Sequence, residues 1–67
     1  MSECLLPRRE VERRTGLSRS SIYARMKAGT FPLPVHDDDT HSVWWVASEI
    51  DAWVMARIAA RNARNQV

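Results

Sequence analysis

The chain has 67 residues, a net charge of +2 and a single cysteine. A chain of this length, residues 1–67, makes one small domain that buries only about 60% of the surface exposed by its unfolded form. Such a thin core rarely encloses a substrate pocket of roughly 300 to 1,000 Å³, so binding by a surface is favoured over catalysis. One cysteine excludes an intramolecular disulfide and a cysteine-rich zinc site.

Positive charge is concentrated in one part of the chain. Between Arg8 and Lys27, seven basic residues stand against two glutamates, a local net charge of +5, whereas residues 28–47 carry only three charged side chains, all aspartates. A local excess of positive charge attracts a polyanion, because neutralised phosphates release their counterions. The alternative interpretation is that these arginines only solvate two surface helices.

The N-terminal part of the chain predicts an arm followed by a short helix. Leu5 and Leu6 in the arm, residues 1–6, are expected to pack on the core. Pro7 fits the first position of a helix that continues to Thr15, since its missing amide donor costs nothing there. Gly16 can adopt the positive φ that often follows a helix end, so the chain is expected to turn at this residue.

A second helix is predicted directly after this turn. Ser18 is a good N-cap, because its hydroxyl can accept a free backbone N–H of the first turn, and Gly29 ends the helix. At 100° per residue Ile22 and Met26 share the inner face, and the outer face is small and polar at its N-terminal end. Two helices joined within fewer than twenty residues have the spacing of a helix-turn-helix, whose second helix enters the major groove of DNA.

The next segment predicts a two-stranded hairpin. Residues 31–34 read FPLP and cannot be helical, because proline lacks an amide donor and restricts the residue before it. Val35 and the run 43–46 then predict two strands, with the acidic stretch at the tip between them.

A last helix is predicted from about residue 48. Ser48 and Asp51 have the spacing of a capping box, and the apolar residues that follow keep helical spacing as far as Ile58, where packing on the core is expected to end. The order helix, turn, helix, hairpin, helix predicts a mainly α fold with a small β-hairpin, a winged helix-turn-helix.

Two segments of the chain resemble a known group of proteins. LLPRREVERRTGLSRSSIYARMKAGTFPLPV and VWWVASEIDAW are similar to the AlpA-type regulators and the small phage excisionases related to them, which are relatives of the MerR-type DNA-binding head. The resemblance covers about residues 5–58, and its most specific parts are TGLSRSSIY, GTFP and the closing helix. It implies a sequence-specific DNA-binding protein of a phage or mobile element, not an enzyme, that regulates transcription or acts as an excisionase in DNA recombination.

The resemblance also implies that the second helix lies in the major groove with the wing alongside. Arg19 has the planar fork that matches guanine O6 and N7, so Arg19 and Ser20 are the expected base contacts. Tyr23, Lys27 and the arginines that begin the first helix suit phosphates. Ser18 can instead act only as a cap, and Tyr23 can be partly buried. The candidate DNA-binding residues are Arg8, Arg9, Ser18, Arg19, Ser20, Ser21, Tyr23, Ala24 and Lys27.

Tryptophans and C-terminal arginines form a second set of candidates. Trp45 and Trp53 correspond to tryptophans that similar proteins bury. Trp44 falls where a basic residue is frequent, and alternation turns it toward solvent, so it either contacts DNA or a protein or folds onto the helices. The arginines of the last helix either stabilise its C-terminus, where positive charge is favourable, or form a second basic contact with DNA or with a partner's acidic surface. The candidate protein contacts are Trp44, Arg57, Arg61 and Arg64.

The wing departs from the family pattern. Similar wings carry glycine and basic residues at the tip, whereas this one carries three consecutive aspartates at 37–39, and Leu33 stands where lysine is frequent. Carboxylates near phosphates are repelled, so the tip is expected to stay clear of the DNA backbone or to accept a partner's basic patch. His36 and His41 are suitable metal ligands by type, but a solvated polar tip explains them equally, and we predict no metal site.

The expected partners are double-stranded DNA, other copies of the chain on adjacent sites, and an integrase or RNA polymerase. No cofactor, membrane or small-molecule substrate is expected, since there is no apolar run of about 18 residues, no signal peptide and no phosphate-binding glycine loop. A cytoplasmic, nucleoid-associated location suits a lone cysteine. The alternative function is a protein-interaction module that uses the acidic wing and Trp44. The DNA sequence recognised and the oligomeric state stay open.

Overall fold

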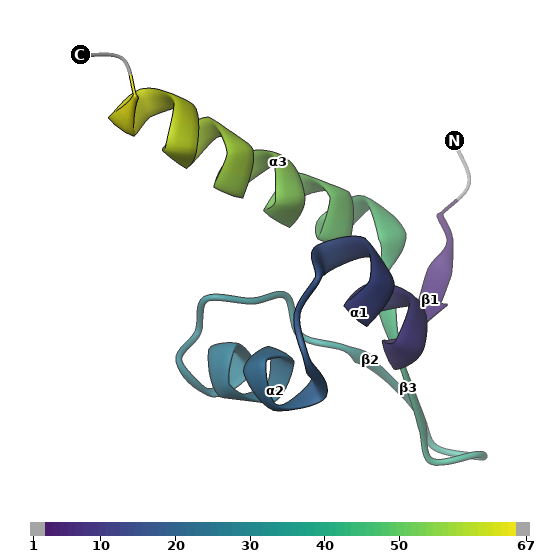
Figure 1. Ribbon diagram of the computed structural model, residues 1–67. Helices are drawn as coiled ribbons and strands as arrows, with labels where there is room; N and C mark the ends of the chain where they lie inside the picture. The colour runs from purple at the N-terminus through teal and green to yellow at the C-terminus, as the bar shows by residue number, and fades with distance from the viewer. Residues whose placement is uncertain (1–2, 66–67) are drawn as a thin grey trace.

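The structure, a computed structural model, describes residues 3–65, so Met1 and Ser2 of the expected arm lie outside the described residues. In Figure 1 the two short helices lie below a long third helix, and a hairpin projects on the side away from the second helix. This arrangement confirms the expected winged helix-turn-helix. The elements are β1 (Leu5–Pro7), α1 (Arg8–Thr15), α2 (Arg19–Lys27), β2 (Val35–Asp37), β3 (Ser42–Val46) and α3 (Ala47–Arg64).

A third strand joins the expected hairpin. β3 lies in the centre of the sheet and pairs antiparallel with both β1 and β2. Leu6 stands opposite Trp45 and is buried, but Leu5 is 46% exposed. The expectation that both leucines pack on the core is therefore wrong for Leu5. Neighbouring residues of a strand point to opposite faces of the sheet, so only one of the two can point inward.

One apolar cluster joins the inner face of the sheet to the helices. Each of the three helices contributes a fully buried side chain to it, so the cluster sets how α2 is held against the rest of the molecule. Its buried members are Leu6, Val11, Ile22, Phe31, Trp45 and Ile50.

The loop between α2 and β2 is held by two indole side chains. Trp45 Nε1 donates to the carbonyl of Pro32 at 3.0 Å, and Trp53 Nε1 donates to the carbonyl of Thr30 at 3.0 Å. Phe31 lies between these carbonyls in the chain and packs edge-on against Trp53, with ring centroids 5.1 Å apart. Trp45 is fully buried as expected, whereas Trp53 is only partly buried at the margin of the core.

The turn residues of the helix-turn-helix act as predicted. Gly16 has φ +74° and its N–H bonds to the carbonyl of Glu12, and Gly29 has φ +78° after the end of α2. Ser18 is the N-cap of α2, and its side chain accepts the backbone N–H of Ser21 at 3.2 Å. Both glycines adopt a conformation that other residues reach only with strain.

The predicted capping box of α3 is wrong. The helix begins at Ala47, directly after β3, and its N-cap is Val46, which has no capping side chain. The hydroxyl of Ser48 donates instead to the carboxylate of Glu3, at 3.0 and 3.1 Å. Because β3 runs straight into the helix, the capping position is occupied by a strand residue.

α3 also leaves the core earlier than predicted. Ile50 is fully buried and Val54 is half-buried, but Ile58 is 38% exposed. The helix continues to Arg64 as an extension beyond the body of the molecule (Figure 1). No helix within residues 3–65 is both long enough and apolar enough to cross a membrane.

Candidate nucleic-acid interface

α2 presents most of the predicted DNA-facing side chains to solvent. Arg19, Ser20, Ala24 and Lys27 are exposed, and Tyr23 is 38% exposed. At 100° per residue they form one continuous face of the helix, opposite the buried side. Its small central residues allow close approach of the helix to a partner.

Arg19 and Tyr23 contact each other on this face. The guanidinium carbon of Arg19 lies 5.8 Å from the centroid of the Tyr23 ring, which is within the range of a cation–π interaction. The contact favours one position of a long side chain before any ligand binds, and this lowers the conformational entropy lost on binding.

Ser18 and Ser21 are bonded to each other. The hydroxyl of Ser18 donates to the hydroxyl of Ser21 at 3.1 Å, in addition to accepting its backbone N–H. Ser21 is half-buried. The hydrogen-bonding capacity of both serines is therefore partly used within the helix, whereas the exposed Ser20 remains turned to solvent.

The arginines of α1 are mostly paired with carboxylates. Three of the four guanidiniums in this helix form ion pairs, and one of them also contacts α3. The pairs are Arg8–Glu12 at 3.1 Å, Arg13–Glu10, Arg14–Glu10 at 3.2 Å and Arg14–Asp51 at 3.6 Å. Exposed pairs of this kind add little stability, but they occupy the donors that would otherwise bind phosphate.

Glu10 is the centre of this network. Hydrogen bonds from Arg13 and then from Arg14 lower the pKa of Glu10 from 4.5 to about 2. The same contact raises the pKa of Arg13. Glu10 is therefore fully ionised near neutral pH and holds both guanidiniums on α1.

The basic side chains of α2 are in a different situation. Within the part of the chain that the structure describes, Arg19, Arg25 and Lys27 form no ion pair, and neither does Arg9 of α1. Arg9 and His41 line a cleft of about 350 Å³ between the start of α1 and β3. Within the helix-turn-helix, the unpaired positive charge is therefore carried by α2 and by Arg9 in the first turn of α1.

Arg25 is a residue that the sequence did not single out. Its guanidinium carbon lies 5.6 Å from the Trp53 ring centroid, and that of Arg57 lies 5.7 Å from the same ring. The spacing of four residues between Trp53 and Arg57 could have indicated one of these contacts. The other joins two helices and has no local signal. Arg25 thus lies on the α3 side of α2, away from the exposed face of that helix.

The remaining C-terminal candidates lie on the extension of α3. Arg61 and Arg64 are exposed, and the Arg61 guanidinium donates to the side-chain oxygen of Asn62 at 2.9 Å. These two arginines thus differ from Arg57, whose guanidinium packs on Trp53 at the margin of the core.

The wing tip is acidic and ordered by its first aspartate. The carboxylate of Asp37 accepts the N–H of Asp39 at 3.0 Å and the hydroxyl of Thr40 at 2.9 Å. Asp38 and Asp39 are exposed. His41 has φ +58°, and its N–H bonds to the carbonyl of Asp37. Among residues 3–65 no three or more His, Cys, Asp and Glu side chains gather as a metal site would require.

Trp44 lies on the outer face of the sheet. It stands between Pro7 of β1 and Val35 of β2, on the face opposite that of Trp45. Trp44 is half-buried there rather than fully exposed.

Comparisons with known proteins agree with the resemblance described above. The family model described as "Prophage CP4-57 regulatory protein (AlpA)" matches residues 4–58. The uncharacterized protein ORF88 of Enterobacteria phage P4 is 44% identical over 52 residues, which cover 78% of this chain and 58% of that protein. The chain thus spans little more than half the length of this relative. No solved structure matches the chain significantly.

The matched family consists of phage regulatory proteins and not of enzymes. Because the family model covers most of its length, the chain belongs to the AlpA family of phage regulatory proteins.

Proposed function

We propose that the chain binds a specific sequence of double-stranded DNA with α2 in the major groove. The observation that supports this most strongly is the contrast between the two helices. α2 exposes Arg19 and Lys27 without a carboxylate partner in the described residues, while three of the four α1 arginines are paired. A major groove about 12 Å wide admits a helix whose exposed face is small and cationic.

The exposed face of α2 divides into base-reading and phosphate-binding side chains. Arg19 is suited to guanine O6 and N7, and the exposed hydroxyl of Ser20 lies beside it on the helix. Ala24 allows close approach to the bases, where it can contact a thymine methyl group. Tyr23 and Lys27 are suited to phosphates, which set the register of the helix without reading sequence.

Other candidates contribute less in this proposal. Arg9 is the preferred phosphate contact of α1, because Arg8 is held by Glu12 at 3.1 Å. Ser18 and Ser21 support the first turn of α2 through their mutual hydrogen bonds. The acidic wing tip stays clear of the DNA backbone, since Asp38 and Asp39 would be repelled by phosphates.

A selection from a random DNA library followed by a footprint tests the proposal. We expect one preferred sequence, protection of the major groove, and affinity that falls log-linearly with salt. Failure to select any motif at low salt would overturn the proposal. The Arg13→Ala variant is the matched control, because it removes an arginine that already pairs with Glu10.

The footprint also distinguishes two roles in the phage or mobile element. An excisionase loads several copies on closely repeated sites and bends the DNA to assist an integrase. A transcriptional regulator occupies a promoter site and contacts RNA polymerase. Closely spaced direct repeats with strong bending support the recombination role, and one site upstream of a gene supports the regulatory role.

A second candidate function is that of a protein-interaction module. It is favoured by Leu33, which is 68% exposed in the loop before β2, and by the acidic wing. In this case binding to DNA would be weak and unspecific, and a protein partner would contact Trp44 and the α3 arginines. A selected DNA motif together with a steep salt dependence excludes this candidate.

A further inference from the structure

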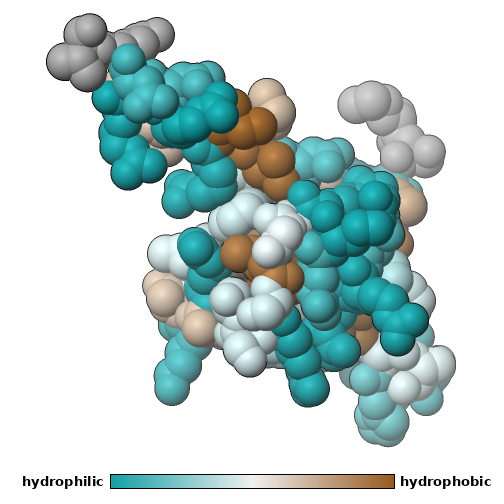
Figure 2. Space-filling model, in the orientation of Figure 1, coloured by the Kyte–Doolittle hydropathy of each residue, from teal (hydrophilic) through white to brown (hydrophobic). Residues whose placement is uncertain are grey.

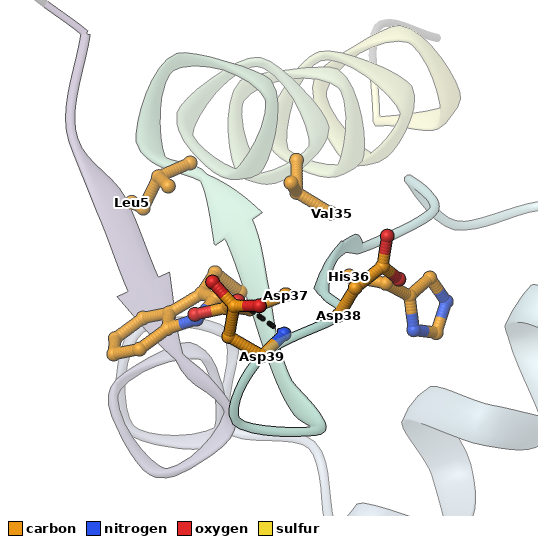
Figure 3. A pocket seen from close by; sticks show the side chains of 7 residues that line it. Leu5, Val35, His36, Asp37, Asp38 and Asp39 are labelled. Atoms are coloured by element: carbon orange, nitrogen blue, oxygen red, sulfur yellow. Dashed lines mark hydrogen bonds between the residues drawn. The ribbon is translucent and has the colours of Figure 1, made fainter.

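The outer face of the sheet forms a cleft with an apolar floor. Leu5 of β1 and Val35 of β2 are 46% and 43% exposed, and Trp44 lies between these strands in β3. With the aspartates of the hairpin they line a cleft of about 460 Å³. Figure 3 shows Leu5 and Val35 at one end of the cleft and Asp37 and Asp39 at the other. The site therefore suits a partner that carries apolar and positively charged groups together.

α3 carries such a combination on its extension. Every residue from Met55 to Arg64 is exposed, and the ten residues make a stretch of about 15 Å. Figure 2 shows an apolar patch next to a hydrophilic end on this helix. The large apolar side chains that α3 exposes are Met55 and Ile58. No acidic residue follows Asp51 in the helix. At 100° per residue, Arg57, Arg61 and Arg64 lie on one side of it, with Ile58 at the margin of that side.

These two surfaces cannot meet within one copy of the chain. Figure 1 shows the C-terminal end of α3 and the tip of the hairpin at opposite corners of the molecule, whose longest extent is 51 Å. The helix is continuous through Arg64, so the extension cannot fold back onto its own wing. A basic, partly apolar helix that enters the cleft must come from another molecule.

We propose that the α3 extension of one copy docks in the wing cleft of the next copy. Ile58 covers the apolar floor formed by Leu5, Val35 and Trp44. Arg61 and Arg64 face Asp38 and Asp39, so opposite charges meet at the rim of the contact. This pairing accounts for two features that DNA binding leaves unexplained, the acidic wing and the exposed cationic end of α3.

The contact joins two different surfaces and is therefore open-ended. A heterologous contact that does not close into a ring leaves a free cleft at one end of a chain of copies and a free helix at the other. One helical stretch buries far less than the roughly 1,200 Å² of a stable complex, so the contact is weak in free solution. DNA that holds copies side by side raises their effective concentration and makes it cooperative. Only this last consequence rests on the proposed DNA binding.

Cysteine cross-linking tests the contact without DNA. Cys4 is exposed and directly precedes Leu5 of the cleft. Ala60→Cys places a thiol beside the arginine stripe, and Ala59→Cys places one about 100° further round the same exposed turn. With a short bis-maleimide at low salt, we expect dimers and longer ladders with Ala60→Cys, well above the background of the unmodified chain. Equal ladders from both variants would overturn the proposal.

Exchange of charge between the two surfaces provides the second test. Asp37 is left in place because it builds the turn. In the Ala60→Cys background, Asp38→Lys with Asp39→Lys, and separately Arg61→Glu with Arg64→Glu, should each reduce cross-linking several-fold. Mixing the two variants should restore it, because an acidic helix then meets a basic wing. No restoration between variants that keep the circular dichroism of the parent chain contradicts the docking.

The outcome separates the two proposals. Binding of the Arg61→Glu, Arg64→Glu variant to DNA with a single site reports α2 alone and should remain within a few-fold of the parent. On DNA with two adjacent sites the same variant should lose cooperativity. Cross-linking without sequence-specific DNA binding would contradict only the proposed function, and specific binding without cross-linking would contradict only the docking.

Discussion

Arg19 and Arg13 carry the same charge in different surroundings. Arg13 is bound to Glu10 on its own helix, whereas Arg19 stacks on Tyr23 and has no carboxylate partner in the described residues. A guanidinium that is already paired has fewer donors free for a phosphate or a base, and the carboxylate beside it lowers the local positive charge. For single residues, the side chains that surround each arginine therefore matter more to the candidate interface than the number of arginines.

Arg19→Ala is expected to weaken binding to the selected DNA by about 1–3 kcal/mol, or roughly 5- to 150-fold, and to relax the preference at one base pair. The reason is the loss of a bidentate contact to guanine. Fluorescence anisotropy on the selected site and on single-base variants measures both effects. Arg13→Ala, the matched control, should change the affinity about 2-fold or less, and equal losses in both variants would contradict the assignment.

Trp45→Phe is expected to destabilise the fold by at least about 1–3 kcal/mol. The substitution leaves the carbonyl of Pro32 without its indole donor in a site where Trp45 is fully buried. Unfolding in urea measures the free-energy change. Trp53→Phe removes a similar bond to Thr30 at a more exposed place and should cost less. A larger loss of stability in Trp53→Phe than in Trp45→Phe would show that the loop is held mainly at α3.

At the scale of elements, each helix of the structure has a different task. α1 pairs three of its four arginines with carboxylates, α2 presents basic side chains that have no ion pair within residues 3–65, and α3 is half core helix and half extension. The loop between α2 and β2 fixes these elements through Trp45 and Trp53. A substitution in one helix should therefore change one measurable property of the protein rather than cause a general loss of function.

The stability of α1 should depend on pH through Glu10. Its pKa is about 2 in the folded chain against 4.5 for a free carboxyl group. A depressed folded pKa adds stability that is complete above about 4.5 and is lost as the pH falls toward about 2. Urea midpoints followed by circular dichroism should fall across this window. In Glu10→Gln the fall should be smaller, and an identical pH profile would show that other carboxyl groups are responsible.

Removal of residues 59–67 should leave the fold intact. The last buried residue of α3 is Ile50, and the side chains beyond Val54 are exposed. We expect the free energy of unfolding to change by about 0.5 kcal/mol or less. Ile50→Ala, the contrasting change in the same helix, should cost about 2–5 kcal/mol. A large loss in the shortened chain would show that the extension supports the core.

At the scale of the whole molecule, charge is divided between distinct regions. The α2 side is positive, the wing tip carries three aspartates, and the end of α3 carries arginines without acidic neighbours. Under the proposed function, attraction of DNA to α2 and repulsion at the wing act together to orient the molecule on a duplex. The net charge of +2 hides this division, because the opposite regions nearly cancel.

Salt dependence should identify the side chains that contact phosphate. The logarithm of the affinity should fall linearly with the logarithm of salt concentration, by about 0.9 for each phosphate neutralised. Lys27→Gln should reduce the slope by about 0.9, because this exposed lysine has no ion-pair partner in the described residues. Arg14→Gln should leave the slope nearly unchanged, since Arg14 already contacts Glu10 and Asp51. Equal changes in both slopes would show that α1 also lies on the DNA.

Local signals in the sequence were sufficient to predict the helix-turn-helix and the outward face of its second helix. Gly16, Ser18 and Gly29 act through interactions within one turn of chain, and the spacing of Ile22 and Met26 marks the inner side of α2. Such signals are local and can be read without knowing the rest of the fold. The buried position of Trp45 followed in the same way from alternation along β3 and from the family resemblance.

Other features depend on contacts between residues that are distant in the chain. β1 has three residues, too few for a periodic pattern, and exists because it pairs with β3. Ser48 bonds to Glu3, which is 45 positions away in the chain, instead of capping α3. Arg14 meets Asp51, and Arg25 meets Trp53, across helices that touch only in the folded chain. Contacts between distant residues depend on how the elements pack. For this reason the sequence alone predicts α2 and its exposed face, but not which arginines are free to bind a partner.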